Sequence, residues 1–210
     1  MERQTWYRDT NLVTWSYFLP MPKDQVVHLD QPDFRRKWIT EQTKKLLHVM
    51  EDFAIIEKAY VSVYNSKEFV LKSPEALISF LKETVNVNEI DLVLTLRCIK
   101  PDSNKGQEVF HIKEGAGLTL EIELDDHGRL YFEKYQHPIH LIFSLHVDIY
   151  SPVTESDIED NSILAGLNGP LLSAFLKRIE EETPFEFDEF DSQGYKGVVG
   201  RYGFKIPRGN

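Results

Sequence analysis

Ser144, His146 and Asp148 are two residues apart along the chain, and their types could supply a nucleophile, a general base and an acid. In an extended strand, residues two apart point to the same face and stand about 7 Å apart. A catalytic triad needs hydrogen bonds of about 2.6–3.2 Å between neighbouring members. The chain also lacks the Gly-x-Ser-x-Gly turn that exposes the serine of many hydrolases. The spacing therefore argues against a serine hydrolase.

His146 and Asp148 could instead serve other chemistry as a pair. They could act as a general base and its orienting acid, with His140 and Tyr150 lining a pocket. They could also bind one metal ion if a neighbouring strand supplied a third ligand. The residues that could supply it are Glu121, Glu123, His127 and Glu133. The simpler alternative is a polar sheet face on which His146 and Asp148 are hydrogen-bonded, and we therefore predict no metal ion and no other cofactor.

Charge is distributed unevenly along the chain. The sequence has 24 Lys and Arg against 34 Asp and Glu, which gives a formal net charge of −10 at pH 7. Eleven of the acids lie between residues 153 and 191, where only Lys177 and Arg178 oppose them. The last nineteen residues carry four basic residues and no acid. Clustered acids attract basic partners and raise association rates, so the segment 153–191 is a candidate docking surface.

We expect this acidic segment to bind a basic protein, with phenylalanines between the acids as anchors. The expected partner-binding residues are Glu180, Glu181, Phe185, Phe187, Asp188, Phe190 and Asp191. One alternative is a solvated surface whose phenylalanines pack inward. Another is a calcium site, but the EF-hand pattern does not fit, because Phe190 occupies a ligand position and no glutamate closes the loop.

Composition excludes several other classes of protein. A hydrophobic content of 41% with 12% aromatic residues excludes wholesale disorder. The excess of acids argues against binding to nucleic acids and to anionic membranes. There is no apolar run of about 18 residues and no signal peptide, so a cytoplasmic protein is expected. The single cysteine, Cys98, cannot form an internal disulfide, and its place beside Leu94 and Leu96 in the alternation predicts a buried side chain.

Alternation of apolar and polar residues predicts the strands that position these side chains. It is clearest over residues 91–100, 118–125 and 139–150. Residues 12–18 and 54–64 are also expected to be strands because they are rich in β-branched and aromatic residues, and residues 109–112 could form a short one. Asp126, His127 and Gly128 favour a turn, after which residues 129–135 should return as the hairpin partner of 118–125.

Three helices are expected between and after these strands. Asp30 or Asp33 should cap a helix that ends near Met50. Ser73 and Pro74 should begin a second helix, which ends near residue 85. A third should begin at residues 168–170, where Asn-Gly-Pro would separate it from a short helix over 162–167.

The order of these elements indicates the fold class. A run of strands from residue 91 to 150 without a helix argues against a doubly wound parallel sheet. We predict an α+β fold, with a mostly antiparallel sheet of about five to seven strands and about three helices on its apolar face. One domain over residues 1–210 is expected, with residues 151–160 as the only plausible boundary.

Two functions are compatible with this prediction. The first is a non-catalytic interaction protein that binds a basic partner through its acidic surface. In composition, though in no motif, the chain is similar to immunity proteins that neutralise bacterial toxins, which implies an inhibitor that covers a basic cleft. The alternative is an enzyme or ligand-binding domain on the polar sheet face around His146 and Asp148, which would need a cover over that face. The sequence leaves self-association open.

Overall fold

A single antiparallel sheet organises the molecule. The computed structural model describes residues 8–20, 28–102, 106–153, 160–192 and 197–205. Seven strands pair in the order β3-β2-β4-β5-β6-β1-β7. Their bounds are β1 (Arg8–Phe18), β2 (Ala54–Val63), β3 (Glu68–Leu71), β4 (Val87–Pro101), β5 (Gln107–Ile122), β6 (Ile139–Val147) and β7 (Glu186–Asp191). A separate hairpin joins β8 (Val199–Gly200) to β9 (Gly203–Phe204).

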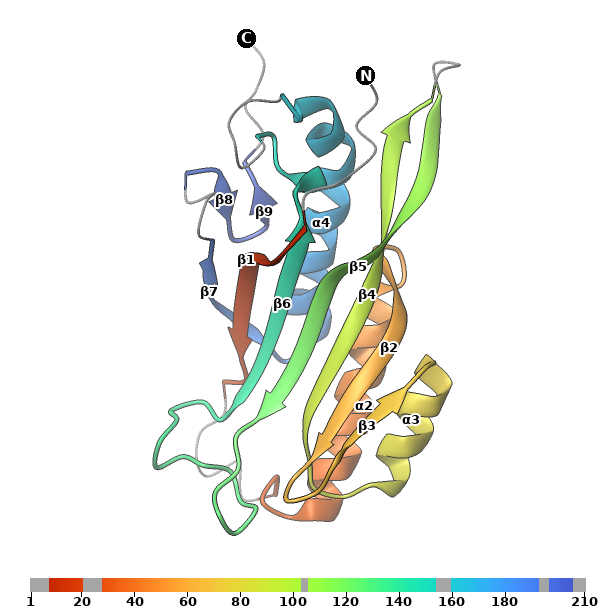
Figure 1. Ribbon diagram of the computed structural model, residues 1–210. Helices are drawn as coiled ribbons and strands as arrows, with labels where there is room; N and C mark the ends of the chain where they lie inside the picture. The colour runs from red at the N-terminus through yellow and green to blue at the C-terminus, as the bar shows by residue number, and fades with distance from the viewer. Residues whose placement is uncertain (1–7, 21–27, 103–105, 154–159, 193–196, 206–210) are drawn as a thin grey trace.

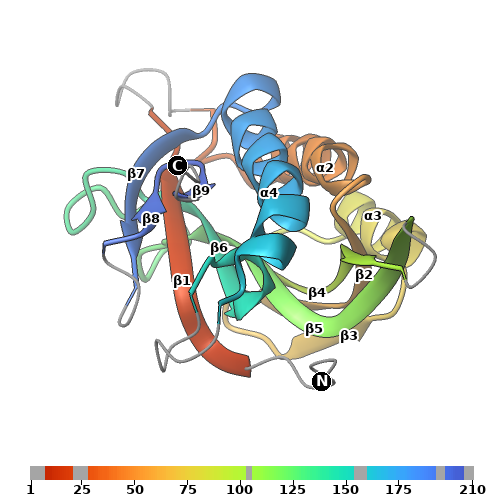
Figure 2. The same ribbon diagram turned by 90° about the horizontal axis from the view of Figure 1, so that it is seen from above.

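The α-helices form a second layer on one face of this sheet. They are α2 (Pro32–Met50), α3 (Pro74–Glu83) and α4 (Ser162–Glu182), and a short 3-10 helix, η1 (Asp148–Tyr150), follows β6. Seen from above, the sheet curves around the helices, and the opposite face turns outward (Figure 2). The predicted α+β fold with helices on one face of an antiparallel sheet is confirmed (Figure 1).

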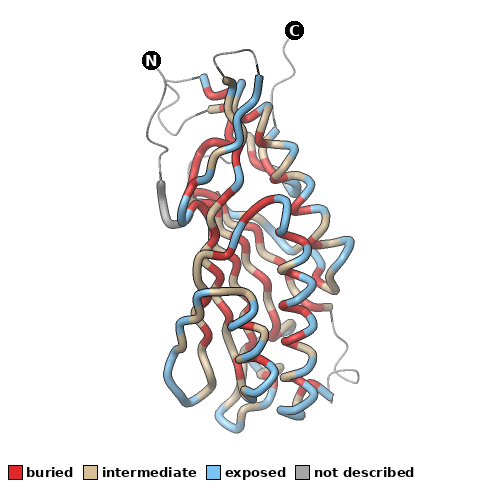
Figure 3. Tube along the Cα trace, turned by 90° about the vertical axis from the view of Figure 1, so that its right-hand side faces the viewer, coloured by how far each residue is buried: buried red, intermediate tan, exposed pale blue. Residues whose placement is uncertain are grey.

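The core lies between the two layers, where Figure 3 shows buried residues alternating along the strands. In β6 every second residue is buried, from Ile139 to Val147. Aromatic rings fill the centre: Phe53 stacks on Phe175 with ring centroids 4.5 Å apart, and Phe143 meets Phe175 edge to face at 5.0 Å. Such pairs contribute about 0.5–1.5 kcal/mol each beyond the area they bury. Alternation therefore decides which face of the sheet receives the helices.

The helix starts agree only in part with the sequence analysis. Ser73 caps α3 as predicted, and its hydroxyl accepts a hydrogen bond from the Ala76 amide at 3.2 Å. Neither Asp30 nor Asp33 caps α2, because the N-cap is Gln31. The Asp30 carboxylate instead accepts a hydrogen bond from the Leu130 amide at 2.9 Å. Asp30 thus fixes the loop after β5 rather than a helix end.

The predicted break at residues 168–170 is wrong, because α4 continues through Pro170. The Asn168 side chain accounts for part of this continuity. Its amide nitrogen donates to the carbonyl oxygens of Leu164, one turn earlier, and of Ile99 on β4. Its amide oxygen accepts from the Ile99 amide. These bonds hold the helix against the sheet immediately before the proline, which itself removes one helical hydrogen bond.

The predicted hairpin strand over residues 129–135 is also wrong. β5 ends at Ile122 and pairs with β6 instead, and beyond it only an isolated bridge joins Leu124 to Leu130. The Asp125 carboxylate accepts hydrogen bonds from the backbone amides of His127 and Arg129 and from the Arg129 guanidinium. A carboxylate that accepts hydrogen bonds from backbone amides two to four residues later in the chain favours a turn over pairing between strands.

Two strands of the seven-stranded sheet are not predicted from the sequence. β3 has four residues, and β7 has six, of which four are acidic. Acidic residues are depleted in strands, so the sequence of β7 does not resemble one. β7 nevertheless pairs with β1 and places Phe187 and Phe190 opposite Tyr17 and Trp15. Burial of these two aromatic side chains against β1 outweighs the poor propensity of the acids.

Candidate functional site

The structure separates the two residues of the predicted catalytic pair. His146 lies on β6, half-buried on the outward face, and its Nδ1 is 3.1 Å from the Glu114 carbonyl oxygen. β6 ends at Val147, so the predicted strand over 139–150 is too long by three residues. Asp148 lies in η1 and is fully buried, and its carbonyl oxygen accepts a hydrogen bond from Asn161. The two side chains therefore do not share a sheet face.

Tyr150 and His140, which were expected to line a pocket with this pair, also lie apart from each other. Tyr150 is fully buried, and its hydroxyl lies 3.6 Å from the Cys98 sulfur. His140 remains on the outward face of β6, opposite Glu121. Within the described ranges, no group of three or more His, Cys, Asp or Glu residues could hold a metal ion. In the same ranges, no helix covers the outward face of the sheet (Figures 1 and 2).

Cys98 has the buried position that the alternation predicts. Burial raises the pKa of its thiol to about 12, and the hydrogen bond with Tyr150 only partly offsets this. The thiolate is the nucleophilic form of cysteine, so the native protein keeps this sulfur unreactive at neutral pH.

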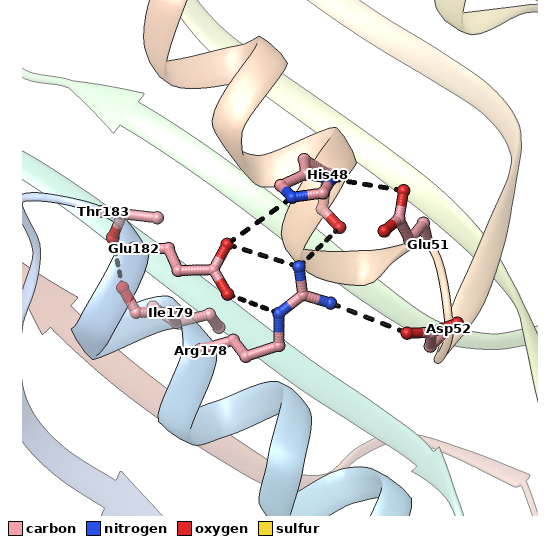
Figure 4. A network of polar contacts seen from close by, with 7 residues as sticks. All are labelled: His48, Glu51, Asp52, Arg178, Ile179, Glu182 and Thr183. Atoms are coloured by element: carbon pink, nitrogen blue, oxygen red, sulfur yellow. Dashed lines mark hydrogen bonds and ion pairs between the residues drawn. The ribbon is translucent and has the colours of Figure 1, made fainter.

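Glu182, at the end of α4, is engaged by Arg178 (Figure 4). The Arg178 guanidinium donates to the Glu182 carboxylate at 2.6 Å and to the His48 carbonyl oxygen at 3.2 Å, and it lies 3.9 Å from Asp52. The hydrogen bond from Arg178 lowers the pKa of Glu182. This network joins α4 to the end of α2, so Glu182 stabilises the helix layer.

Glu180 and Phe185 are likewise used inside the molecule. Glu180 forms a bidentate ion pair with Arg201, in which the Arg201 Nε donates to the Glu180 carboxylate at 3.0 Å. Phe185 is buried and packs edge to face against Trp38, with centroids 6.4 Å apart. Of the candidates between Glu180 and Phe185, only Glu181 is exposed and without an ion pair to a described residue.

The predicted residues after Phe185 lie on β7, at the edge of the sheet. Phe187 is half-buried and meets Tyr17 edge to face, while the Arg201 guanidinium lies over its ring. Phe190 is also half-buried, opposite Trp15. The acids of β7 are exposed, and none forms an ion pair with a described residue. They are Glu186, Asp188, Glu189 and Asp191.

The strand register extends this acidic edge across the outward face. Glu89 on β4 lies directly opposite Glu121 on β5, and Asp91 lies opposite Thr119. The row that contains this pair crosses the whole sheet and ends in an acid at both edges. From β3 to β7 its members are Glu68, Ser62, Glu89, Glu121, His140, Phe18 and Glu186. We name the acids Glu68, Glu89, Asp91, Glu121, Glu186, Glu189 and Asp191 the acidic face.

Two carboxylates of the acidic face are electrostatically strained. Partial burial, followed by the charges of Glu121, Asp91 and Glu68, raises the pKa of Glu89. Burial and Glu123 raise the pKa of Glu121. Like charges directly opposite each other on neighbouring strands are destabilising. From the sequence alone, Glu121 is only a possible metal ligand, and Glu68, Glu89 and Asp91 have no predicted role, because only the strand register places these acids together.

Comparisons with family models, curated proteins and solved structures found no match to this chain. No helix in the described part of the chain is both long and apolar enough to cross a membrane. The residues themselves therefore carry the functional argument.

Proposed function

We propose that the protein is a non-catalytic interaction protein that binds a basic protein partner through the acidic face. One observation carries this proposal: Glu89 and Glu121 oppose each other on an outward face that no described helix covers. The pair costs stability. A partner whose Lys or Arg side chains lie between the carboxylates would relieve that repulsion, which makes binding more favourable.

The location differs from that expected from the sequence. The acids of α4 are largely neutralised by Arg178 and Arg201, whereas those of β7 are exposed. Of the predicted partner-binding residues, the docking surface that we propose therefore keeps Asp191, together with Glu186 and Glu189 of the same strand. It adds acids of β3, β4 and β5. It omits Glu180, Glu181, Phe185, Phe187, Asp188 and Phe190. Separation of His146 from Asp148 weakens the case for catalysis on the same face.

A capture experiment with two matched variants tests this proposal. The bait is the protein itself, exposed to a lysate of its source cells at low salt. In the first variant Glu186, Glu189 and Asp191 are changed to Lys. In the control variant Glu41, Glu83 and Glu181 are changed to Lys, which gives the same change of charge on exposed positions of the helix layer.

We expect a basic protein to be captured by the wild type and by the control, but not by the sheet variant, and to be released at high salt. Equal capture by all three baits would contradict the acidic face as the docking surface. Loss of capture with the helix variant alone would place the surface on the helix layer instead.

A further inference from the structure

The hairpin of β4 and β5 extends beyond the rest of the sheet (Figure 1). β2 pairs with β4 only as far as Leu96, and β6 pairs with β5 only from Ala116 onward. Past these points the two strands pair only with each other. We name this two-stranded extension, residues 97–101 and 107–115, the arm.

The β4 edge of the arm is closed to further pairing. The Arg97 amide donates to the Phe53 carbonyl oxygen at 2.9 Å. At Ile99 the side chain of Asn168 acts as a short piece of strand, because its oxygen accepts from the Ile99 amide at 2.7 Å and its nitrogen donates to the Ile99 carbonyl at 2.8 Å. Pro101 ends the strand and has no amide proton to offer.

The β5 edge of the arm is open. Arg97 and Ile99 direct backbone groups away from β5, so each forms a non-hydrogen-bonded pair with the residue opposite it. These residues are His111 and Val109, respectively. The backbone groups of Val109 and His111 consequently point outward, where no described strand lies beside them. The Val109 side chain is 46% exposed.

The terminal strands of the sheet carry features that oppose strand addition, and residues 107–112 of the arm carry fewer of them: they pair with β4 without a register shift and include one acid, Glu108. β3 is only four residues long. β7 carries four acids and an irregular register against β1. Short length, charge and bulges are the usual protections of an edge strand. In contrast, residues 107–112 of β5 pair regularly with β4.

Two cationic side chains, Arg97 and Lys113, lie beside the open edge in a protein of net charge −10, and the nearby Glu114 carboxylate is paired with Lys58. Arg97, His111 and Lys113 are exposed on the outward side of the arm, and neither Arg97 nor Lys113 forms an ion pair with a described residue. A second copy of the same edge would bring a second set of these cations to one junction. Carboxylates at alternate positions of an incoming strand would instead face them.

We propose that an acidic, extended segment of a partner protein adds to the β5 edge of the arm as an additional strand. Its backbone would pair with the outward groups of Val109 and His111, and its acids would face Arg97 and Lys113. Backbone pairing supplies affinity in this mode, and side chains supply specificity. This inference goes beyond the proposed function, because it concerns another surface and a segment of opposite charge.

The probe is a short synthetic peptide of alternating Glu and Thr, with both ends blocked. It is titrated into the isotope-labelled protein, and backbone amide signals are followed by NMR. We expect the signals of Val109 and His111 to shift and their hydrogen exchange to slow. A version of the peptide with N-methyl groups on alternate residues keeps every charge but loses backbone donors, and it should bind on the order of tenfold more weakly.

Protein variants provide the matched controls. Val109→Pro removes an outward donor without breaking a bond to β4, and it should weaken binding as N-methylation does. Val109→Thr should bind as the wild type does. If Val109→Pro fails to fold, the double reversal Arg97→Glu and Lys113→Glu leaves the backbone intact and should also weaken binding.

Three results would overturn the inference. The first is unchanged signals at Val109 and His111. The second is equal binding of the N-methylated peptide, which would indicate attraction by charge alone. The third is a protein that sediments as a dimer and becomes a monomer when Val109 is changed to Pro. That result would make a second copy of the chain the occupant of the edge. None of these results bears on the acidic face, which a basic probe tests separately.

Discussion

At the scale of single residues, Glu89 and Glu121 are the clearest sign that stability is not optimised on the outward face. Both have raised pKa values, and the largest cause in each case is partial burial. A carboxyl group whose pKa is raised on folding binds more protons in the folded state than in the unfolded state. Its contribution to stability therefore falls as the pH rises from the ordinary pKa through the raised one.

We expect Glu121→Gln to stabilise the protein at neutral pH by about 0.5 kcal/mol, because it removes one of two facing charges. The gain should shrink in acid, below the ordinary carboxyl pKa, where the pair is already protonated. Urea unfolding at both pH values measures it. Glu186→Gln is the matched control, because it removes a charge from the same row where Phe18, not an acid, lies opposite. An equal gain in the control would contradict this account.

Cys98 gives a second residue-scale prediction. Its buried thiol, with a pKa of about 12, should not react with an aromatic disulfide reagent while the protein is folded. The reaction rate should rise together with the unfolded fraction across a urea titration. Complete reaction in the absence of urea would show that the core around Tyr150 opens, contrary to the packing described.

The sequence pattern alone predicts the burial of Cys98, but it does not predict that His146 and Asp148 lie in different surroundings. Their spacing predicts a shared face only while the strand continues. The chain turns into η1 at Asp148, and Asn161 supports that turn by donating to the carbonyl oxygens of Asp148 and Ser151. The decisive partner is therefore distant in sequence, and no local pattern reveals it.

At the scale of elements, Asn168 connects α4 to the arm. Its side chain is fully buried and bonds both backbone groups of Ile99. We expect Asn168→Ala to destabilise the protein by roughly 2 kcal/mol or more, since it leaves buried backbone groups unpaired. Hydrogen exchange at the Ile99 amide should become faster at the same time, which NMR measures directly.

Gly166→Ala is the control for this variant on the same helix. A methyl group at Gly166 meets no atom within 4 Å, and alanine favours a helix over glycine by about 0.5–1 kcal/mol. The control should therefore be at least as stable as the wild type. If Asn168→Ala were equally stable, Asn168 would not hold α4 to the arm.

Element boundaries were predictable where the pattern was local. The alternation in β4, β5 and β6 gives the buried face, and Ser73 gives the start of α3. β7 was not predictable, because its acids are unfavourable in a strand and its formation depends on pairing with Trp15 and Tyr17 of β1, which are distant in sequence. The continuous α4 was not predictable either, because Asn168 compensates for the proline through a contact with β4.

At the scale of the whole molecule, acidic and basic side chains are separated along the strands of the sheet. The acidic face crosses the sheet near one end of its strands, whereas the cations Arg97 and Lys113 lie on the arm at the other end. The sequence predicted an acidic docking surface in one segment, 153–191. The acidic face instead combines acids from four strands, and such a combination requires the strand order and register, which composition does not contain.

The most direct test of the acidic face is a titration of the isotope-labelled protein with hexalysine at low salt, followed through its backbone amide signals. We predict shifts in β7 and around Glu68, Glu89 and Glu121, and their loss at high salt. Shifts confined to α2 and the end of α4, or centred on His146, would contradict the proposal that the protein binds basic partners through its outward sheet face.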